Sequence, residues 1–205
     1  MNRLGLKRGR HSLVALIGVA MLCAVSVSVP AQPVFQYPET MKDVDPGIDH
    51  GNTANLPEEY QRQMVFYRSQ QPPGTIIIET AERHLYLIEN ETRALRYGIG
   101  VGRDGFTWAG LLKITRKSEW PDWRPPPEMI ERQPYLPRFM AGGPGNPLGA
   151  RAMYLGNTVY RIHGTNAPET IGHAVSSGCF RLVNDDVADL FDRVEVGTHV
   201  IVRQN

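Results

Sequence analysis

Cysteine is scarce in this chain, with two in 205 residues, Cys23 and Cys179. Cys23 lies in an apolar run, residues 13–29, that follows a cluster of basic residues near the start of the sequence. This order of charge and hydrophobicity is the layout of a signal peptide. Removal of the signal peptide leaves Cys179 as a single thiol, which excludes an internal disulfide framework. Nucleophilic chemistry is the best explanation for an unpaired cysteine in an exported protein.

The small residues of Val29-Pro30-Ala31 predict that residues 1–31 are removed as the signal peptide. Retention of this segment as an uncleaved inner-membrane anchor is the alternative, because the apolar run is only slightly short for a membrane span. A signal peptide without a sorting tail predicts a periplasmic protein. Contact with the membrane is then limited to this first segment.

Neither sign of charge is in large excess. The formal charge of +1 becomes −3 when the signal peptide and its four basic residues are removed, which argues against a nucleic-acid partner. Paired Cys-x-x-Cys and His-x-x-x-His elements are also lacking. A metal site built from His163, His173 and Cys179 is therefore the less favoured interpretation, and we expect neither a metal nor a cofactor.

The exported chain changes in composition at about residue 74. Residues 32–73 begin with a stretch rich in Pro, Asp, Asn and Gly, which predicts an extended leader. The last part of the leader carries aromatic and apolar residues at helical spacing, which predicts one short amphipathic helix at 56–68. Residues 74–205 are long enough for one domain with its own core.

This domain contains short β-branched and apolar runs separated by turn residues, a pattern typical of strands. The predicted strands are residues 75–78, 85–88, 93–101, 111–115, 150–155, 159–162 and 199–202. Most consecutive strands are joined by short links without a helical pattern. We therefore expect a mainly antiparallel sheet.

Residues 118–147 hold eight of the sixteen prolines and two of the three tryptophans. They lack helix or strand periodicity, which predicts a long ordered loop near the site. Trp120 and Trp123 either line a groove for a ligand there or fasten the loop to the sheet. Residues 184–194 begin with Asn184 as an N-cap and continue with apolar residues at i, i+3, i+4 and i+7, which predicts a helix. The fold class is thus mainly β, with a short helix packed on the sheet.

A thiol of ordinary pKa, about 8.5, is mostly protonated near neutral pH, so a nucleophilic Cys179 needs a base or a positive potential. His163, sixteen positions upstream, is the candidate base. Its tautomer must be fixed by an acceptor, and a backbone carbonyl such as that of Gly164 suits this role. Gly178 permits a tight turn whose amide groups point at a developing oxyanion. Arg181 either adds positive potential or forms a structural salt bridge.

The segments around these residues resemble the L,D-transpeptidase catalytic domain of the YkuD type, a family of bacterial cell-wall enzymes. The signature of that family is His-Gly-Thr, followed by Ser-His-Gly-Cys and Arg-Leu. The matching blocks are His163-Gly164-Thr165-Asn166, Ser176 to Leu182, Gly74 to Ile77, Asn146 to Ala152 and Val196-Gly197-Thr198. The resemblance covers about residues 74–203 and does not extend to the leader.

This resemblance implies a β-sandwich-like fold in which Cys179 is the nucleophile, His163 the general base and the Gly164 carbonyl the group that orients His163. It implies that the substrate is a peptidoglycan tetrapeptide stem. The acceptor amine forms a cross-link between stems, exchanges a terminal D-amino acid or belongs to an outer-membrane lipoprotein. The residues expected to contact substrate are Arg181, Ser177, Thr165, Asn166, Trp120 and Trp123.

Two positions depart from the family pattern. Ser177 stands where many members carry histidine, and Trp108 stands where the family often has proline. The sequence also leaves two other functions open. One is an L,D-carboxypeptidase, in which water replaces the acceptor amine, and the other is a catalytically silent wall-binding module.

Overall fold

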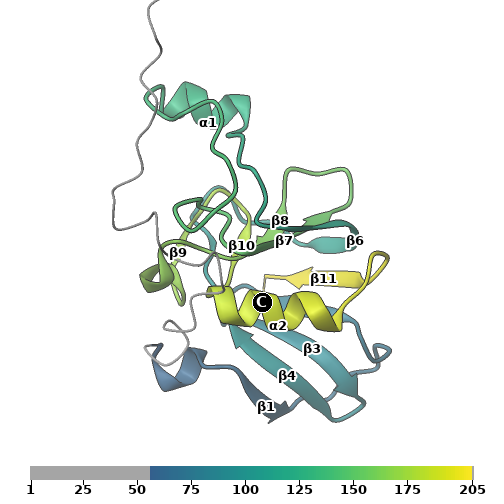
Figure 1. The fold of residues 1–205 in the computed structure, drawn as a ribbon. Coiled ribbons are helices and arrows are strands. Elements are labelled where there is room, and N and C mark those ends of the chain that lie inside the picture. Colours follow the sequence, from purple (N-terminus) through teal and green to yellow (C-terminus); the bar gives the residue numbers. More distant parts are fainter. Residues whose placement is uncertain (1–55, 205) are drawn as a thin grey trace, which may run out of the picture. The chain divides into compact units, whose positions relative to one another are not determined.

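The structure is a computed structural model and describes residues 56–204. The predicted signal peptide and most of the predicted leader lie outside these residues. No helix described within residues 56–204 is long and apolar enough to cross a membrane. The elements, shown in Figure 1, are η3 (Glu58–Tyr60), β1 (Gln63–Phe66), β2 (Ile76–Glu79), β3 (His84–Asn90), β4 (Arg93–Gly98), β5 (Val101–Gly102), β6 (Gly110–Glu119), α1 (Pro127–Arg132), β7 (Arg151–Leu155), β8 (Arg161–His163), η4 (Pro168–Thr170), β9 (Ala174–Ser176), β10 (Phe180–Arg181), α2 (Asn184–Arg193) and β11 (His199–Arg203).

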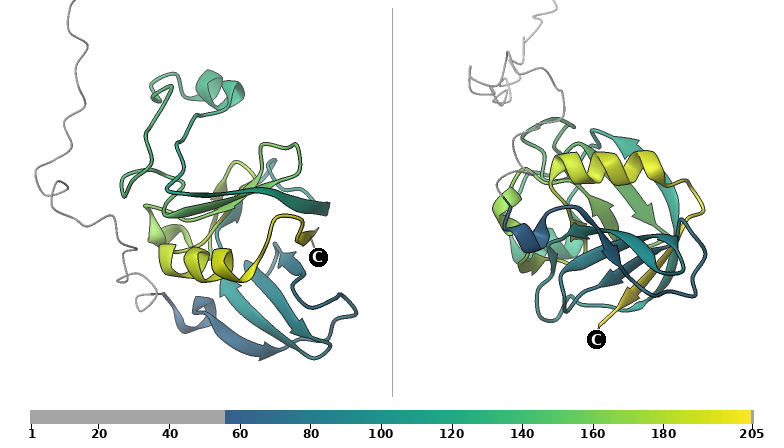
Figure 2. Two further views of the ribbon diagram at one scale, coloured as in Figure 1. Left: turned by 45° about the vertical axis from the view of Figure 1, so that its right-hand side comes forward. Right: turned by 90° about the horizontal axis from the view of Figure 1, so that it is seen from below.

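Nine strands form one hydrogen-bonded sheet in the order β1-β4-β3-β2-β11-β6-β7-β8-β10, and β5 pairs with β9 separately. Most pairs are antiparallel, whereas β2–β11, β8–β10 and β5–β9 are parallel. The long strand β6 pairs with β11 through its first residues and with β7 through its last. The two parts of the sheet that meet at β6 form the two layers seen in Figure 2.

Side chains from both layers and from α2 fill one core, which confirms the mainly β, sandwich-like class. Its members include Ile76, Leu85, Tyr97, Met153, Ile162, Phe180 and Leu190. Helix α2 contributes Val187 and Leu190 to this core, as the amphipathic pattern predicts. In Figure 1 this helix lies in front of the sheet, and the helix prediction for residues 184–194 is confirmed to within one residue.

The prediction of an amphipathic helix at residues 56–68 is wrong. The segment forms the single 3-10 turn η3 and then strand β1, which pairs antiparallel with β4. Val65 packs against a cluster of buried side chains, whereas Met64 and Phe66 are exposed, so burial follows strand alternation. The free edge of β4 offers backbone hydrogen bonds to residues 63–66, whereas a short helix without tertiary contacts is only marginally stable. Strand pairing therefore prevails over the helical spacing of the apolar residues.

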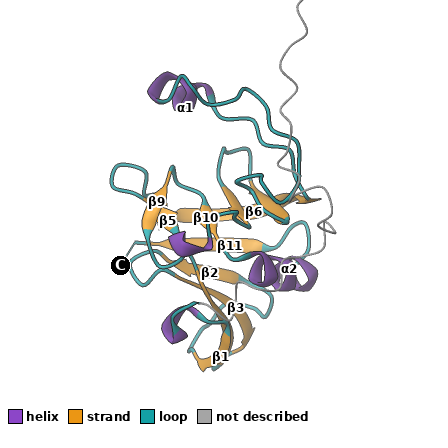
Figure 3. Ribbon diagram, turned by 60° about the vertical axis from the view of Figure 1, so that its left-hand side comes forward, coloured by secondary structure: helices purple, strands orange, loops and turns teal. Residues whose placement is uncertain are grey.

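The predicted loop at residues 118–147 contains more regular structure than expected. Strand β6 extends to Glu119, and helix α1 forms in the middle of the loop. At the base of the loop, Trp123 and Met140 exchange backbone hydrogen bonds of 2.8 and 2.9 Å. Figure 3 shows α1 carried away from the sheet by the two arms of the loop. The short run of α1 gives too few turns for its period to be read from sequence.

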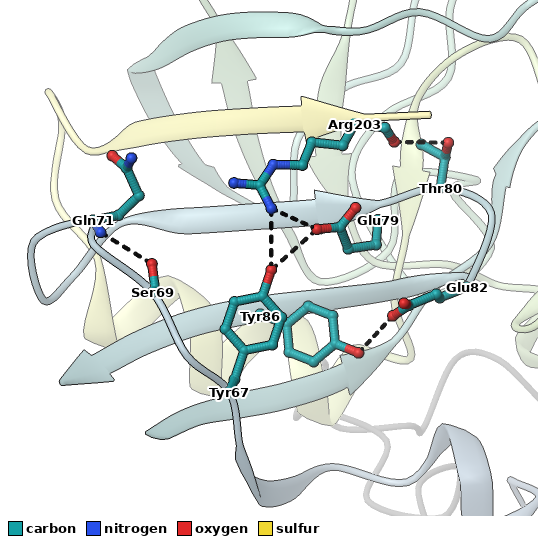
Figure 4. A network of polar contacts seen from close by, with 8 residues as sticks. All are labelled: Tyr67, Ser69, Gln71, Glu79, Thr80, Glu82, Tyr86 and Arg203. Carbon is teal, nitrogen blue, oxygen red and sulfur yellow. Dashed lines mark hydrogen bonds and ion pairs between the residues drawn. The ribbon is translucent and has the colours of Figure 1, made fainter. Parts of the chain in front are cut away.

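A polar network connects the segment after β1 with the last strand (Figure 4). Arg203 donates to Glu79 at 2.9 Å, and Tyr67 donates to the same carboxylate at 3.0 Å. The Tyr67 ring stacks on Tyr86, with 4.4 Å between ring centroids, and Tyr86 donates to Glu82 at 2.7 Å. These contacts join β2, β3 and β11 to the segment that follows β1.

Tyr60, at the end of η3, packs against the segment that leads to Cys179. It belongs to an apolar cluster with Leu56, Ile171 and Val183. Gly172 has φ +81°, and a Cβ built on it would lie 2.4 Å from the Tyr60 ring. The close approach of the ring therefore requires glycine at residue 172, both for the backbone angle and for space.

We predict that Gly172→Ala destabilises the fold more than Gly105→Ala. Gly105 has φ +80° but nothing within 4 Å of its Cβ position, so alanine there incurs only the backbone penalty of about 1 kcal/mol. The clash with Tyr60 adds about 1–3 kcal/mol at Gly172. Urea unfolding of both variants measures the difference. Equal losses would show that the Tyr60 contact is not tight, whereas Tyr60→Ala combined with Gly172→Ala should give a less than additive loss.

Candidate active site

The two residues of the predicted nucleophile–base pair lie together. Strand β8 ends at His163 and β10 begins directly after Cys179, and the two strands pair in parallel with Arg181 opposite His163. Cys179 and His163 line the same cavity, which has a volume of about 260 Å³. Strand pairing thus unites two side chains that are sixteen positions apart in the sequence.

His163 is held in one tautomer. The residue is buried, and its Nδ1 lies 2.5 Å from the carbonyl oxygen of Gly164. Because a carbonyl oxygen only accepts hydrogen bonds, Nδ1 carries the proton and Nε2 keeps its lone pair. Burial, followed by the charge of Arg181, lowers the pKa of His163 to about 3. The imidazole is therefore neutral near neutral pH and can accept a proton at Nε2.

The Cys179 thiol is partly exposed, with Sγ 3.7 Å from the carbonyl oxygen of Val159. The surrounding protein raises the pKa of Cys179 by desolvation, while Arg161 and Arg181 lower it. The resting cavity thus contains a neutral thiol and a neutral imidazole and not an ion pair. A neutral thiol must lose its proton before its sulfur can act as a nucleophile, and His163 is the candidate acceptor of that proton.

Arg161 is a site residue that the sequence analysis missed. It lies on β8 two positions before His163, and side chains at i and i+2 of a strand share one face. It lines the cavity together with Cys179, and its guanidinium lies 5.2 Å from the ring centroid of Tyr154. Strand alternation through Tyr160-Arg161-Ile162-His163 was the signal that could have revealed it. Arg161 and Arg181 supply positive charge near the thiol, where Ser177 supplies none.

The turn before Cys179 is fixed by the Ser176 hydroxyl. Ser176 Oγ donates to the Cys179 carbonyl at 2.6 Å and accepts from the Gly178 amide at 3.1 Å. Gly178 has φ +101°, and a Cβ there would lie 2.6 Å from the Tyr160 ring. The Gly178 N–H is thus already donated to Ser176, and any contact with an oxyanion would compete with this bond. The oxyanion role of Gly178 stays a prediction.

Trp108, the second departure from the family pattern, contacts the same turn. Its Nε1 donates to the Gly178 carbonyl at 2.9 Å, and its ring stacks on Tyr160 with 4.5 Å between centroids. The ring also approaches Phe180 of β10, at 5.5 Å between centroids. The tryptophan therefore supports the backbone on which Cys179 is carried.

The predicted substrate contacts divide into two groups. Ser177, Arg181 and Trp123 line the cavity with Cys179, whereas Thr165, Asn166 and Trp120 are not among its lining residues. The backbone N–H of Trp120 donates to Ala150 at 2.7 Å, which places this residue at the end of the β6–β7 pairing. The Asn166 side chain donates to the Gly145 carbonyl at 3.0 Å. The roles of these six residues toward substrate remain predictions.

Asn184 is not the N-cap of α2 that we predicted. It is the first helical residue, and Val183 precedes the helix without a side-chain capping bond. Asn184 Oδ1 instead accepts from the amides of Ala150 at 3.0 Å and Thr165 at 3.3 Å. The buried amide thus fixes the backbone next to Gly164, and tertiary partners override its local capping preference. Asn184 is a positioning residue for the carbonyl that orients His163.

Charge in the cavity is of one sign. The side chains that line it include four arginines and no aspartate or glutamate, namely Arg103, Arg132, Arg161 and Arg181. Among residues 56–204, no three His, Cys, Asp or Glu side chains are grouped so as to hold a metal ion. The cavity thus combines a thiol, a neutral base and an electropositive lining.

Comparison with known proteins defines the family of this site. Residues 73–202 match the YkuD family, the L,D-transpeptidase catalytic domain. The chain is 42% identical over 134 residues to the Escherichia coli protein named "Probable L,D-transpeptidase ErfK/SrfK", covering 61% of this chain and 42% of that protein. It is 36% identical over 175 residues to "Probable L,D-transpeptidase YbiS" of Escherichia coli, covering 78% and 54%. The chain belongs to the YkuD L,D-transpeptidase catalytic-domain family and spans about half the length of these curated relatives.

The fold is shared with solved members of the class. The crystal structure of L,D-transpeptidase 3 from Mycobacterium tuberculosis has a TM-score of 0.53 at 14% sequence identity, covering 65% of this chain and 62% of that chain. At this identity the likeness concerns the fold alone. The predicted β-sandwich-like architecture is therefore confirmed.

We predict that Arg161→Gln slows alkylation of Cys179 by iodoacetamide. Loss of this positive charge raises the thiol pKa and reduces the thiolate fraction, so the rate at pH 8 should fall by about threefold to tenfold. The rate is followed by peptide mass analysis, which separates Cys179 from Cys23. Arg116→Gln is a matched control, because Arg116 lies over the same Tyr154 ring at 3.5 Å but does not line the cavity. Equal slowing in both variants would contradict a specific effect of Arg161.

Proposed function

We propose that the protein is a peptidoglycan L,D-transpeptidase that uses Cys179 as nucleophile. The observation that carries the proposal is the tautomer of His163, whose Nδ1 is bound to the Gly164 carbonyl while Nε2 is free to accept the thiol proton. Both side chains line one cavity in the family's catalytic domain. The substrate class comes from the family and from the names of its relatives.

The reaction has two halves. In the first, the Cys179 sulfur attacks the carbonyl carbon of the third residue of a donor tetrapeptide stem, and its proton passes to Nε2 of His163. The tetrahedral intermediate collapses, the bond to the terminal D-alanine breaks, and His163 returns the proton to the leaving amine. In the second, an acceptor amine attacks the thioester carbonyl and gives a proton to His163, the carbon–sulfur bond breaks, and the proton passes to the departing Cys179 sulfur. Each half needs one proton acceptor and no cofactor.

The electrostatics of the site favour this sequence of charge changes. A negative charge develops first on sulfur and then on the carbonyl oxygen, and Arg161 and Arg181 lie close enough to lower the Cys179 pKa. His163 becomes positively charged only during each half-reaction. Its low pKa in the resting protein makes the protonated imidazole short-lived. The base is thus regenerated rapidly after each transfer.

The acceptor distinguishes the outcomes. An amine from a second stem gives a cross-link, a free D-amino acid gives exchange, and a lipoprotein amine gives attachment of that protein to the wall. Water as acceptor gives the L,D-carboxypeptidase. We place the reaction in the periplasm, reached through the predicted signal peptide.

We predict that the purified protein converts disaccharide-tetrapeptides into cross-linked dimers, detected by mass spectrometry. Cys179→Ala should lower turnover by more than about 1,000-fold, because residues 56–204 contain no other thiol. His163→Gln should lower it by about 100-fold to 10,000-fold through loss of the base. Tripeptides without dimers would favour the carboxypeptidase. Unchanged turnover in Cys179→Ala would disprove the nucleophile assignment, and absence of turnover in the folded wild type would support the silent module.

A carbapenem, whose strained amide mimics an acylating stem, should form a covalent adduct at Cys179. Intact-mass measurement should show one adduct on the wild type, and peptide mapping should locate it at Cys179. The Cys179→Ala variant should show none. An adduct at another residue would contradict the proposed site.

A further inference from the structure

Two arginines of the cavity belong neither to β8, which contains His163, nor to β10, which follows Cys179. Arg103 follows β5, and Arg132 is the last residue of α1, in the long proline-rich loop. Both line the cavity that contains Cys179. They come from segments about thirty positions apart in the sequence, so their meeting is a product of the fold.

One aromatic ring holds both guanidinium groups. The guanidinium carbon of Arg103 lies 4.6 Å from the ring centroid of Phe106, and that of Arg132 lies 4.9 Å from it. Each contact is within the range of a cation–π interaction. Two positive groups are thus held close to the same ring, although like charges repel each other.

Phe106 is itself fixed against the nucleophile turn. Its amide donates to the Arg103 carbonyl at 2.9 Å, and the Arg103 amide donates to the Ser176 carbonyl at 3.0 Å. The Phe106 carbonyl oxygen would lie 3.1 Å from a Cβ on Gly178, so the backbones pack closely. Arg103 and Phe106 therefore have a defined position relative to Cys179.

Neither arginine is paired with a carboxylate in the part of the chain that the structure describes. No Asp or Glu within residues 56–204 forms an ion pair with Arg103 or Arg132, and no acidic side chain lines the cavity. By contrast, Arg62, Arg151, Arg193 and Arg203 are all paired with carboxylates. An anion near Phe106 would relieve the repulsion, and a carboxylate matches the planar fork of a guanidinium.

We propose that Arg103 and Arg132, held over Phe106, bind a carboxylate of the donor peptide at the cavity and thereby select stems with free carboxylates over stems with amidated ones. This inference rests on the proposed function for the identity of the peptide. Arg132 comes from the α1 loop, so the bound carboxylate would also connect this loop to the segment that follows β5. Arg161 and Arg181 remain available for charge that develops at the reacting atoms.

Binding to the full chain with Cys179→Ala tests the proposal without turnover. Isothermal titration should give a disaccharide-tetrapeptide with free carboxylates about tenfold tighter binding than its fully amidated analogue, because charge-assisted bonds are lost on amidation. In the same background, Arg103→Gln and Arg132→Gln should each weaken binding of the free form by about fivefold to tenfold and leave binding of the amidated form unchanged. Arg103→Lys should weaken binding less than Arg103→Gln does, since lysine keeps the positive charge but lacks the planar guanidinium.

Arg124→Gln is the matched control. Arg124 belongs to the same loop and lies 4.5 Å from the ring centroid of Phe139, but it does not line the cavity. This variant should bind both peptides as the parent does. Equal binding of free and amidated peptides, or equal weakening by Arg124→Gln, would overturn the proposal. Circular dichroism and thermal unfolding identify any variant whose weaker binding comes from loss of the fold.

The results separate this inference from the proposed function. Dimer formation by the wild type, together with unchanged binding in both arginine variants, would overturn the carboxylate site and leave the transpeptidase intact. Arginine-dependent binding of the acidic peptide without any turnover would support the site and contradict the transpeptidase. Steady-state assays of Arg103→Gln and Arg132→Gln with Cys179 intact distinguish donor from acceptor. A change in the KM for the acceptor alone would overturn the assignment of the carboxylate to the donor.

Discussion

The short parallel pairing of β8 with β10 is the interaction on which the site depends. Only two residue pairs form it, Phe180 with Ile162 and Arg181 with His163, and a backbone bond of 2.9 Å from Leu182 to the His163 carbonyl extends it. Phe180 and Ile162 are buried in the main core, which keeps the strands in register. A shift of β10 by one residue would turn Arg181 away from the face on which His163 lies. Core packing therefore sets the relative position of Cys179 and His163.

The chemistry of this site depends on what surrounds the pair. Burial keeps both the thiol and the imidazole neutral at rest, because the protein stabilises neither charge well on its own. Arg161 and Arg181 favour a negative charge on the Cys179 sulfur, as the proposed attack requires. A buried neutral pair with nearby cations is suited to acyl transfer, since charge is formed only when the substrate carbonyl is present. Because the pKa of His163 is lower in the folded chain than in the unfolded chain, the unfolded chain binds a proton first as the pH falls. The contribution of His163 to the free energy of unfolding therefore decreases as the pH falls below about 6.5.

Local patterns predicted most strands and the α2 helix. They also singled out Cys179, His163 and Gly164, of which Cys179 and His163 line one cavity and Gly164 binds His163. They failed where tertiary contacts decide the outcome. Residues 56–68 have helical spacing, but the open edge of β4 made Gln63–Phe66 a strand. Asn184 has the identity of an N-cap, yet its side chain binds Ala150 and Thr165. Arg103 and Arg132 carry no signature in sequence, because only folding brings them to one ring. The contacts of Asn184 with Ala150 and of Arg132 with Phe106 are long-range, which single-sequence reasoning does not reach.

The position of β11 has a consequence for how the protein is made. This strand follows all other described strands in the chain, yet it lies between β2 and β6 in the middle of the sheet. The sheet cannot close until β11 has been synthesised, and the pairing of β11 with β2 spans more than a hundred residues. Such non-local pairing slows folding. A late central strand thus keeps the nascent polypeptide open until β11 is available, so the two layers cannot close on their core earlier.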